Sequence, residues 1–193
     1  MTTTPLSLLE RLRSNPDEES WARLVSLYDP WLDRVLLHAG VADSDVDDLR
    51  QEVLAAVFRE MPGFEHNGRA GAFRRWMRSI VVNRVRGYFR ARQTTTQRTT
   101  EPESWSHIAD PIAELEDYWD REHDRYLIAE LLKIVEPCFS RSTWRAFQRQ
   151  VIDGLRASAV APELGISVNA AMLAKSRVMS RLRAEGRLLL DDV

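Results

Sequence analysis

The sequence predicts an all-α protein with two small helical domains joined by a flexible linker. Apolar residues recur at three- and four-residue steps along most of the 193 residues, and no alternating pattern indicates a strand. Residues typical of helix ends, such as Gly40, Pro62 and Gly165, separate these periodic segments. Residues 93–111 have no apolar period and many Thr, Ser and Pro residues, which is typical of a linker.

We expect the N-terminal domain, residues 5–92, to be a bundle of three or four helices. Its first apolar stripe, residues 24–36, ends at Gly40. Pro30 lies within this stripe and predicts a kink or two abutting helices. Asp43 or Ser44 is the expected N-cap of the next helix. That helix has a buried stripe of Leu49, Val53, Val57 and Met61, and a third helix is expected from about Ala72 to Arg92.

The C-terminal domain, residues 112–193, ends in a helix-turn-helix pattern. Ser158 is the expected cap of a short helix, Gly165 forms the turn, and Ser167 caps a longer basic helix. Pro162 then lies four residues after Ser158, near the helix start, where proline is tolerated; a distorted helix is the alternative. The preceding helix is expected to bury Trp144, Phe147, Val151 and Ile152, and the basic helix to bury Ala171, Val178 and Leu182.

The composition excludes several classes of protein. No apolar run approaches the roughly 18 residues of a membrane span, and the N-terminus lacks the features of a secretory signal. The single Cys138 excludes a disulfide framework, and the four His residues have no metal-ligand spacing. No Gly-rich phosphate loop or Ser/His/Asp pattern indicates catalysis. We therefore expect a cytoplasmic protein that is not an enzyme, needs no metal or cofactor, and is a monomer when free.

Charge is strongly segregated along the chain, although the net charge is only −2. Residues 1–65 and 101–139 are acidic, with net charges of −7 and −8. Residues 66–100 contain nine Arg and no acid, and residues 140–187 have a net charge of +6. Two cationic blocks favour contact with a polyanion such as DNA, while solvated helix faces are the alternative.

Three segments resemble signatures of one known family. Residues 47–53, DDLRQEV, are similar to the D-D-L-x-Q-E-V/T motif of bacterial RNA polymerase sigma factors, sigma-70 family, extracytoplasmic-function (ECF) group. Phe64 and residues 71–84, GAFRRWMRSIVVNR, resemble the F-R…F-x-x-W-L-x-x-I-A-x-N stretch of the same conserved region. Residues 163–168, ELGISV, resemble the turn of the fourth conserved region. The resemblance covers nearly the whole chain.

This resemblance implies docking on core RNA polymerase. In the family, the D-D-L-x-Q-E helix binds the clamp coiled coil of the largest subunit, and the polymerase flap is a second contact. Asp45, Asp48 and Glu52 share one helix face by their spacing. The alternative is that such acids complement the helix macrodipole, which explains Glu52 poorly. The expected polymerase-binding residues are Asp45, Asp48, Gln51 and Glu52.

The resemblance also implies two promoter contacts. The third helix and the loop before it would melt the −10 element and capture a flipped base, since cations and aromatic rings suit single strands. The expected residues there are Phe64, Asn67, Arg74, Arg75, Arg78 and Asn83. The basic helix of the C-terminal domain would read a −35 duplex, with side chains that reach bases and phosphates. The expected residues there are Ser167, Asn169, Ala170, Met172, Leu173, Lys175, Ser176, Arg177 and Arg181.

Two other functions fit the same sequence. One is a helix-turn-helix regulator that never engages polymerase, and the other is a helical adaptor with no role in nucleic-acid binding. Co-purification with polymerase separates the first alternative from a sigma factor, and salt-dependent DNA binding separates both from the adaptor. An anti-sigma factor and a kinase acting on the Thr-rich linker are regulatory partners that the sequence leaves open.

Overall fold

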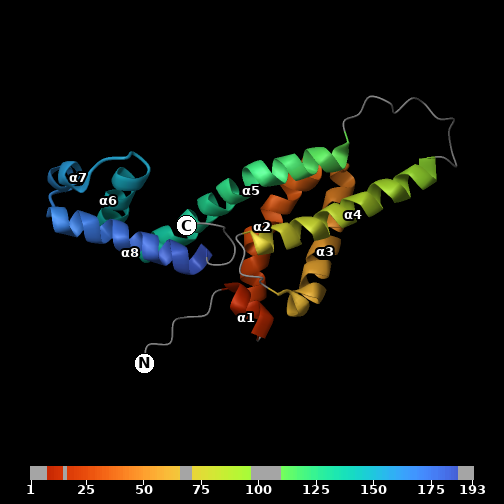
Figure 1. Cartoon of the computed structure of the whole chain (residues 1–193), viewed down its shortest axis with the longest axis horizontal. Coiled ribbons are helices and arrows are strands. Elements are labelled where there is room, and N and C mark those ends of the chain that lie inside the picture. The colour runs from red at the N-terminus through yellow and green to blue at the C-terminus, as the bar shows by residue number, and fades with distance from the viewer. Residues whose placement is uncertain (1–7, 15–16, 66–70, 97–109, 187–193) are drawn as a thin grey trace. The chain divides into compact units, whose positions relative to one another are not determined.

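The computed structural model describes residues 8–14, 17–65, 71–96 and 110–186. Within these ranges every regular element is a helix and no strand occurs, so the predicted all-α class is confirmed (Figure 1). The chain divides into two compact units, with the boundary between Leu127 and Ile128. Most of the predicted linker lies outside the described residues, apart from its ends in two helices.

The first unit contains five helices and one 3-10 turn. These are α1 (Leu8–Ser14), α2 (Glu18–His38), α3 (Asp43–Glu60), η1 (Met61–Gly63), α4 (Ala72–Thr96) and the first part of α5 (Pro111–Val135). The predicted stripe of α3 is buried, as are the inward residues of α4. The buried residues of these two helices include Leu49, Val53, Val57, Phe73, Met77, Ile80, Val81 and Val85.

Two local expectations for the first unit need correction. α2 runs through Pro30 as one helix, so it does not divide into two abutting helices. Pro30 is exposed, and water can therefore hydrate the carbonyl that proline leaves without a donor. The N-cap of α3 is Ala42, without a side-chain cap bond, and not Asp43 or Ser44. The helix starts early because the turn at Gly40, whose φ is 80°, is followed at once by extended backbone at Ala42.

The first part of α5, residues 111–127, belongs to the first unit because aromatic side chains join it to α2. The Trp31 ring centroid lies 5.6 Å from that of Trp119 and 5.1 Å from that of Tyr126. Trp31 and Trp119 are both fully buried. The sequence placed this helix in the C-terminal domain, beginning at residue 112. The structure differs because helical period locates a helix but does not show which neighbour covers its apolar face.

The second unit contains the rest of α5, η2 (Glu136–Cys138), α6 (Arg141–Val151), α7 (Ala157–Leu164) and α8 (Val168–Gly186). Trp144 and Phe147 of α6 are buried as expected, but Val151 and Ile152 are exposed. Gln150 is buried instead, and its amide donates 2.8 Å hydrogen bonds to the carbonyls of Ala146 and Ala171. A polar side chain therefore holds α6 against α8 where the sequence predicted an apolar one.

The α7–turn–α8 segment has the predicted layout with a different start. α7 begins after Arg156, so Ser158 is inside the helix and does not cap it. Pro162 is thus well within α7, which nevertheless stays helical to Leu164. Gly165 has a φ of 64°, as a left-handed turn requires, and the Ser167 hydroxyl accepts the Ala170 N–H at 3.1 Å. The predicted turn and second cap are confirmed.

No single membrane-spanning helix and no metal-binding cluster occur in residues 8–14, 17–65, 71–96 and 110–186. No single helix in these ranges is long and apolar enough to span a membrane. The bent pair α7 and α8 has sufficient length and apolar composition only when the two helices are taken together. The same ranges contain no group of three or more His, Cys, Asp or Glu side chains that could hold a metal ion.

The packing of α5 on α2 predicts how a cleaved chain behaves. A specific protease site inserted between Arg98 and Glu103 would release an N-terminal piece that holds α2 and a C-terminal piece that holds α5. We expect the two pieces to co-elute in gel filtration, because separation would expose Trp31 and Trp119 to water. A Trp119→Ala version should separate more readily. Separation of the cleaved wild-type pieces in native buffer would contradict this packing.

Candidate functional site

A groove between α3 and α4 brings together most of the predicted polymerase-binding residues. Asp45, Asp48 and Glu52 line it from α3, and Asn83 and Tyr88 line it from α4. Asp48 and Glu52 are exposed. Among the described residues, ion pairs are found for Asp45 but not for Asp48 or Glu52. The groove therefore presents two carboxylates that can meet a cationic partner.

Asp45 is already engaged within the chain. Its carboxylate accepts a 2.7 Å hydrogen bond from the Tyr88 hydroxyl and lies 3.0 Å from the Arg92 guanidinium. The Tyr88 hydrogen bond, followed by that of Ser44 and the Arg92 charge, lowers the pKa of Asp45. Asp45 thus ties the start of α3 to α4, and it offers less to a partner than Asp48 does.

Arg50 and Gln51 belong to a polar cluster that joins α3 to α2. The Arg50 guanidinium contacts Asp29 at 2.8 Å, Asp33 at 2.6 Å, and also Asp47. The Gln51 amide donates to Asp47 at 3.2 Å, and its side chain is exposed. The acidic motif therefore divides by role: Asp47 serves the fold, whereas Asp48 and Glu52 face solvent.

Three predicted −10 residues are occupied by contacts inside the first unit. The Arg74 guanidinium contacts Asp124 at 2.8 Å, and that of Arg78 contacts Asp120 at 2.6 Å. Both acids belong to α5, which the sequence assigned to the other domain. Phe64 is 5% exposed, with its ring centroid 4.9 Å from that of Trp76. All three side chains therefore hold α4 in place within the first unit, and their assignment as −10 contacts stays a prediction.

The other three predicted −10 residues have different positions. Arg75 is exposed on α4, as a DNA contact requires. Asn83 lies between apolar residues in the sequence, but it is exposed in the α3–α4 groove that Asp48 and Glu52 also line. Asn67 lies outside the described residues. Asn83 is therefore not part of the buried face of α4, although apolar residues flank it in the sequence.

An exposed basic stripe on α4 contains Arg75, which the sequence predicted as a DNA contact, and Arg86 and Arg90, which it did not. Arg75, Ser79, Arg86 and Arg90 follow one another at steps of four, seven and four residues, and all four are exposed. These steps keep side chains on one helix face. The same spacing count applied to arginines, and not only to apolar residues, would have found Arg86 and Arg90.

A buried polar chain positions Arg74. His123 is completely buried, and its Nε2 lies 3.2 Å from the Tyr28 hydroxyl. Its Nδ1 lies 2.8 Å from the Asp124 carboxylate, which in turn contacts Arg74. Burial, reinforced by the charge of Asp124, raises the pKa of Tyr28 well above its ordinary value, so the phenol stays neutral. The chain links α2, α5 and α4.

The helix pair α7–α8 forms the second candidate site. The two helices are bent by 107° at the turn, within the usual range for a helix-turn-helix. Arg149 of α6 holds α7 through a bidentate contact with Glu163 and also contacts Asp153 at 2.7 Å. These hydrogen bonds raise the pKa of Arg149. The turn is thereby fixed against α6.

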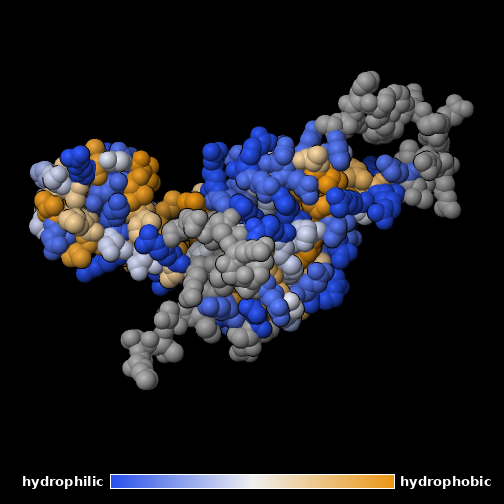
Figure 2. Space-filling view, in the orientation of Figure 1, coloured by the Kyte–Doolittle hydropathy of each residue, from blue (hydrophilic) through white to orange (hydrophobic). Residues whose placement is uncertain are grey.

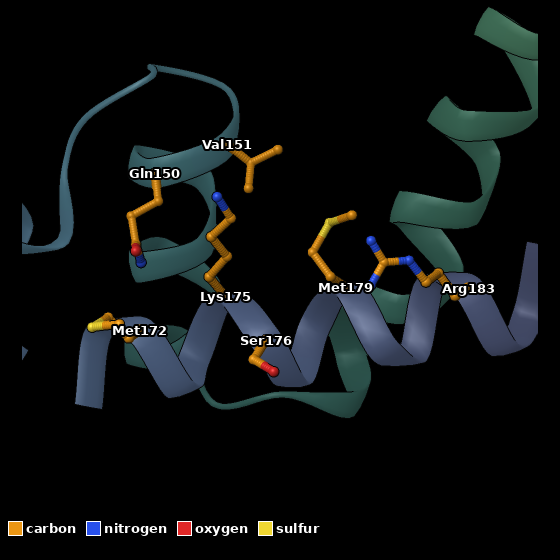
Figure 3. A pocket seen from close by; sticks show the side chains of 7 residues that line it. All are labelled: Gln150, Val151, Met172, Lys175, Ser176, Met179 and Arg183. Carbon is orange, nitrogen blue, oxygen red and sulfur yellow. The ribbon is translucent and has the colours of Figure 1, made fainter. Parts of the chain in front are cut away.

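The predicted −35 residues mostly lie on the exposed part of α8. Ser167 acts as the helix cap, and Ala170 is half-buried. Arg181 is exposed but contacts Glu185 at 2.7 Å. Figure 3 shows Lys175 projecting from α8 toward the side where Gln150 and Val151 of α6 lie, in a groove it also lines with Met172. The remaining predicted residues, all exposed, are Asn169, Met172, Leu173, Lys175, Ser176 and Arg177.

The Asp124 contacts predict a pH-dependent effect of Asp124→Asn. We expect the substitution to lower the free energy of unfolding by about 1–3 kcal/mol at pH 7, since Arg74 and His123 lose a charged partner. The His123 hydrogen bond, with the Arg74 charge, lowers the pKa of Asp124 from 3.8 despite opposing burial. Such a carboxylate stabilises fully above its unfolded pKa, and this stability is lost as the pH falls through the folded pKa.

The difference between wild type and Asp124→Asn should therefore shrink below about pH 4. Denaturant unfolding at pH 7 and pH 3 measures it. Asp117→Asn, at an exposed position of the same helix, is the control and should change stability by less than about 0.5 kcal/mol. An equal loss for Asp124→Asn at both pH values would exclude a charge effect.

Comparison with known families gives one finding for the first unit. Residues 24–95 match the family model of Sigma-70 region 2. The match covers α3 and most of α2 and α4, and therefore both the acidic groove and the basic stripe. This segment of the chain is therefore similar to Sigma-70 region 2. No curated protein matches the chain significantly.

Proposed function

We propose that the chain is a sigma factor of the ECF group that directs promoter-specific initiation by core RNA polymerase. The observation that carries this proposal is the Sigma-70 region 2 match over the segment that holds the exposed carboxylates Asp48 and Glu52. An acidic helix face beside a groove suits a basic helical partner, such as the clamp coiled coil of the largest subunit. The flap is the second proposed polymerase contact.

We assign the −10 element to the exposed stripe of α4. Arg75, Arg86 and Arg90 can track a phosphate backbone, and exposed arginines also stack on unpaired bases. Arg74 and Arg78 are not among the proposed DNA contacts, because their guanidinium groups contact acids of α5 and hold α4 against that helix. Melting of the −10 element therefore depends on α4 being held rigidly by α5.

We assign the −35 duplex element to α8. A capped helix after a tight turn, with cations at Lys175 and Arg177, suits insertion into a major groove. The bend of 107° between α7 and α8 also favours the second candidate, a helix-turn-helix regulator that binds DNA without polymerase. The two functions differ in one property, which is association with core polymerase.

Charge reversal in the groove tests polymerase docking. We expect Asp48→Arg with Glu52→Arg to abolish co-purification with core polymerase and run-off transcription, because two repulsive charges replace two attractive ones. Folding should be unaffected, since both side chains are exposed. Glu114→Arg with Asp117→Arg, at exposed positions of α5, makes the same charge change and should leave docking intact. Unchanged co-purification of the groove variant would favour the regulator.

Arginine substitutions on α4 test the −10 assignment. We expect Arg75→Ala with Arg86→Ala to reduce permanganate reactivity of unpaired thymines in promoter complexes while duplex binding is retained. The slope of the logarithm of the binding constant against the logarithm of the salt concentration should become less steep by about 0.7 for each lost phosphate contact. Arg74→Ala with Arg78→Ala should instead lower the free energy of unfolding, since both residues hold α5. Normal melting by the Arg75/Arg86 variant would refute the assignment.

A further inference from the structure

The exposed side of α8 carries large apolar side chains in its first turns. Met172 is 59% exposed, and Leu173 and Val168 are each 45% exposed. They are three of the eight large hydrophobic residues that are exposed in the described part of the chain. Figure 2 shows orange apolar patches among the hydrophilic surface on the visible face of the second unit.

These side chains are not needed for the packing of α8. The helix is anchored by a separate buried stripe, Ala171, Ala174, Val178 and Leu182, at steps of three or four residues. Met172 and Leu173 fall between the stripe positions and project away from it. Isolated exposed hydrophobics are ordinary, but two adjacent ones at the front of a capped helix form a contact surface.

The charge around this surface indicates what covers it. Asn169 and Ser176 lie on the same side of the helix, and Lys175 and Arg177 flank it. Within α8 the one acidic residue is Glu185, which is paired with Arg181 far from these turns. A cationic rim around apolar side chains suits a partner with an anionic backbone and an apolar recognition feature. The major groove of duplex DNA has both, because thymine presents a 5-methyl group there.

We propose that Met172 and Leu173 read thymine 5-methyl groups, so that the duplex element bound by α8 is selected for thymine at the positions they face. This inference rests on the proposed function, since it requires α8 to enter a major groove. Asn169 and Ser176 offer hydrogen bonds to neighbouring base edges, and Lys175 and Arg177 contact phosphates. Specificity in the thymine positions then comes from shape and apolar contact.

The test uses the full chain bound to core polymerase. Duplexes selected from a randomised library are resynthesised with dU in place of each dT, which removes only the 5-methyl group. We expect one or two dT positions at which this change weakens binding about fourfold, because one buried methyl is worth about 0.8 kcal/mol. Met172→Ala with Leu173→Ala should bind the dT and dU duplexes equally. Both positions are exposed and alanine favours helix, so the fold should be retained.

A matched variant and three outcomes decide the proposal. Ile152→Ala removes an exposed apolar side chain of the same unit outside α8, and it should keep the discrimination between dT and dU. Equal binding of dT and dU duplexes by wild type, with duplex binding intact, overturns the methyl readout and leaves the proposed function standing. Loss of polymerase association in the Met172/Leu173 variant also overturns it, because the pair would then face protein. Absence of any duplex binding removes both proposals.

Discussion

The packing of Trp31 of α2 against α5 is the interaction on which the first unit depends. Trp31 lies within 5.8 Å, centroid to centroid, of rings of Tyr118, Trp119, His123 and Tyr126. Aromatic pairs of this kind contribute about 0.5–1.5 kcal/mol each beyond the area that they bury. Because α5 is held here, its acids Asp120 and Asp124 are fixed beside α4. The aromatic contact therefore determines which arginines of α4 are paired with acids of α5 and which remain exposed.

A consequence is that the arginines of the first cationic block that the structure describes do not act alike. Arg74 and Arg78 face acids of α5, and Arg92 faces Asp45 of α3. Arg75 and Arg86 are directed to solvent. A block that looks uniform in sequence is thus divided into structural cations and surface cations. The surface cations can bind the phosphates of a nucleic acid, with release of counterions, while the contacts of the fold stay intact.

In the second unit, a buried polar side chain holds the helices together. Gln150 bonds the backbone of both α6 and α8, and Arg149 bonds Glu163 of α7, so three short helices are held by directional contacts. Small residues such as Ala171 and Ala174 allow close packing at this place. Because Ala171, Ala174, Val178 and Leu182 form the buried face of α8, Leu173 remains on the surface of the helix.

The sequence by itself determined the helical class, the buried stripes of α3 and α8, the Gly165 turn and the Ser167 cap. Each of these follows from local rules, because helical period and capping involve residues a few positions apart. The roles of Arg74, Phe64, Asn83 and the first part of α5 were decided only by the tertiary structure. Asp124 is 50 residues from Arg74, and His123 is 95 residues from Tyr28. A contact between residues so far apart in the chain produces no periodic pattern in the sequence, so the sequence alone does not reveal it.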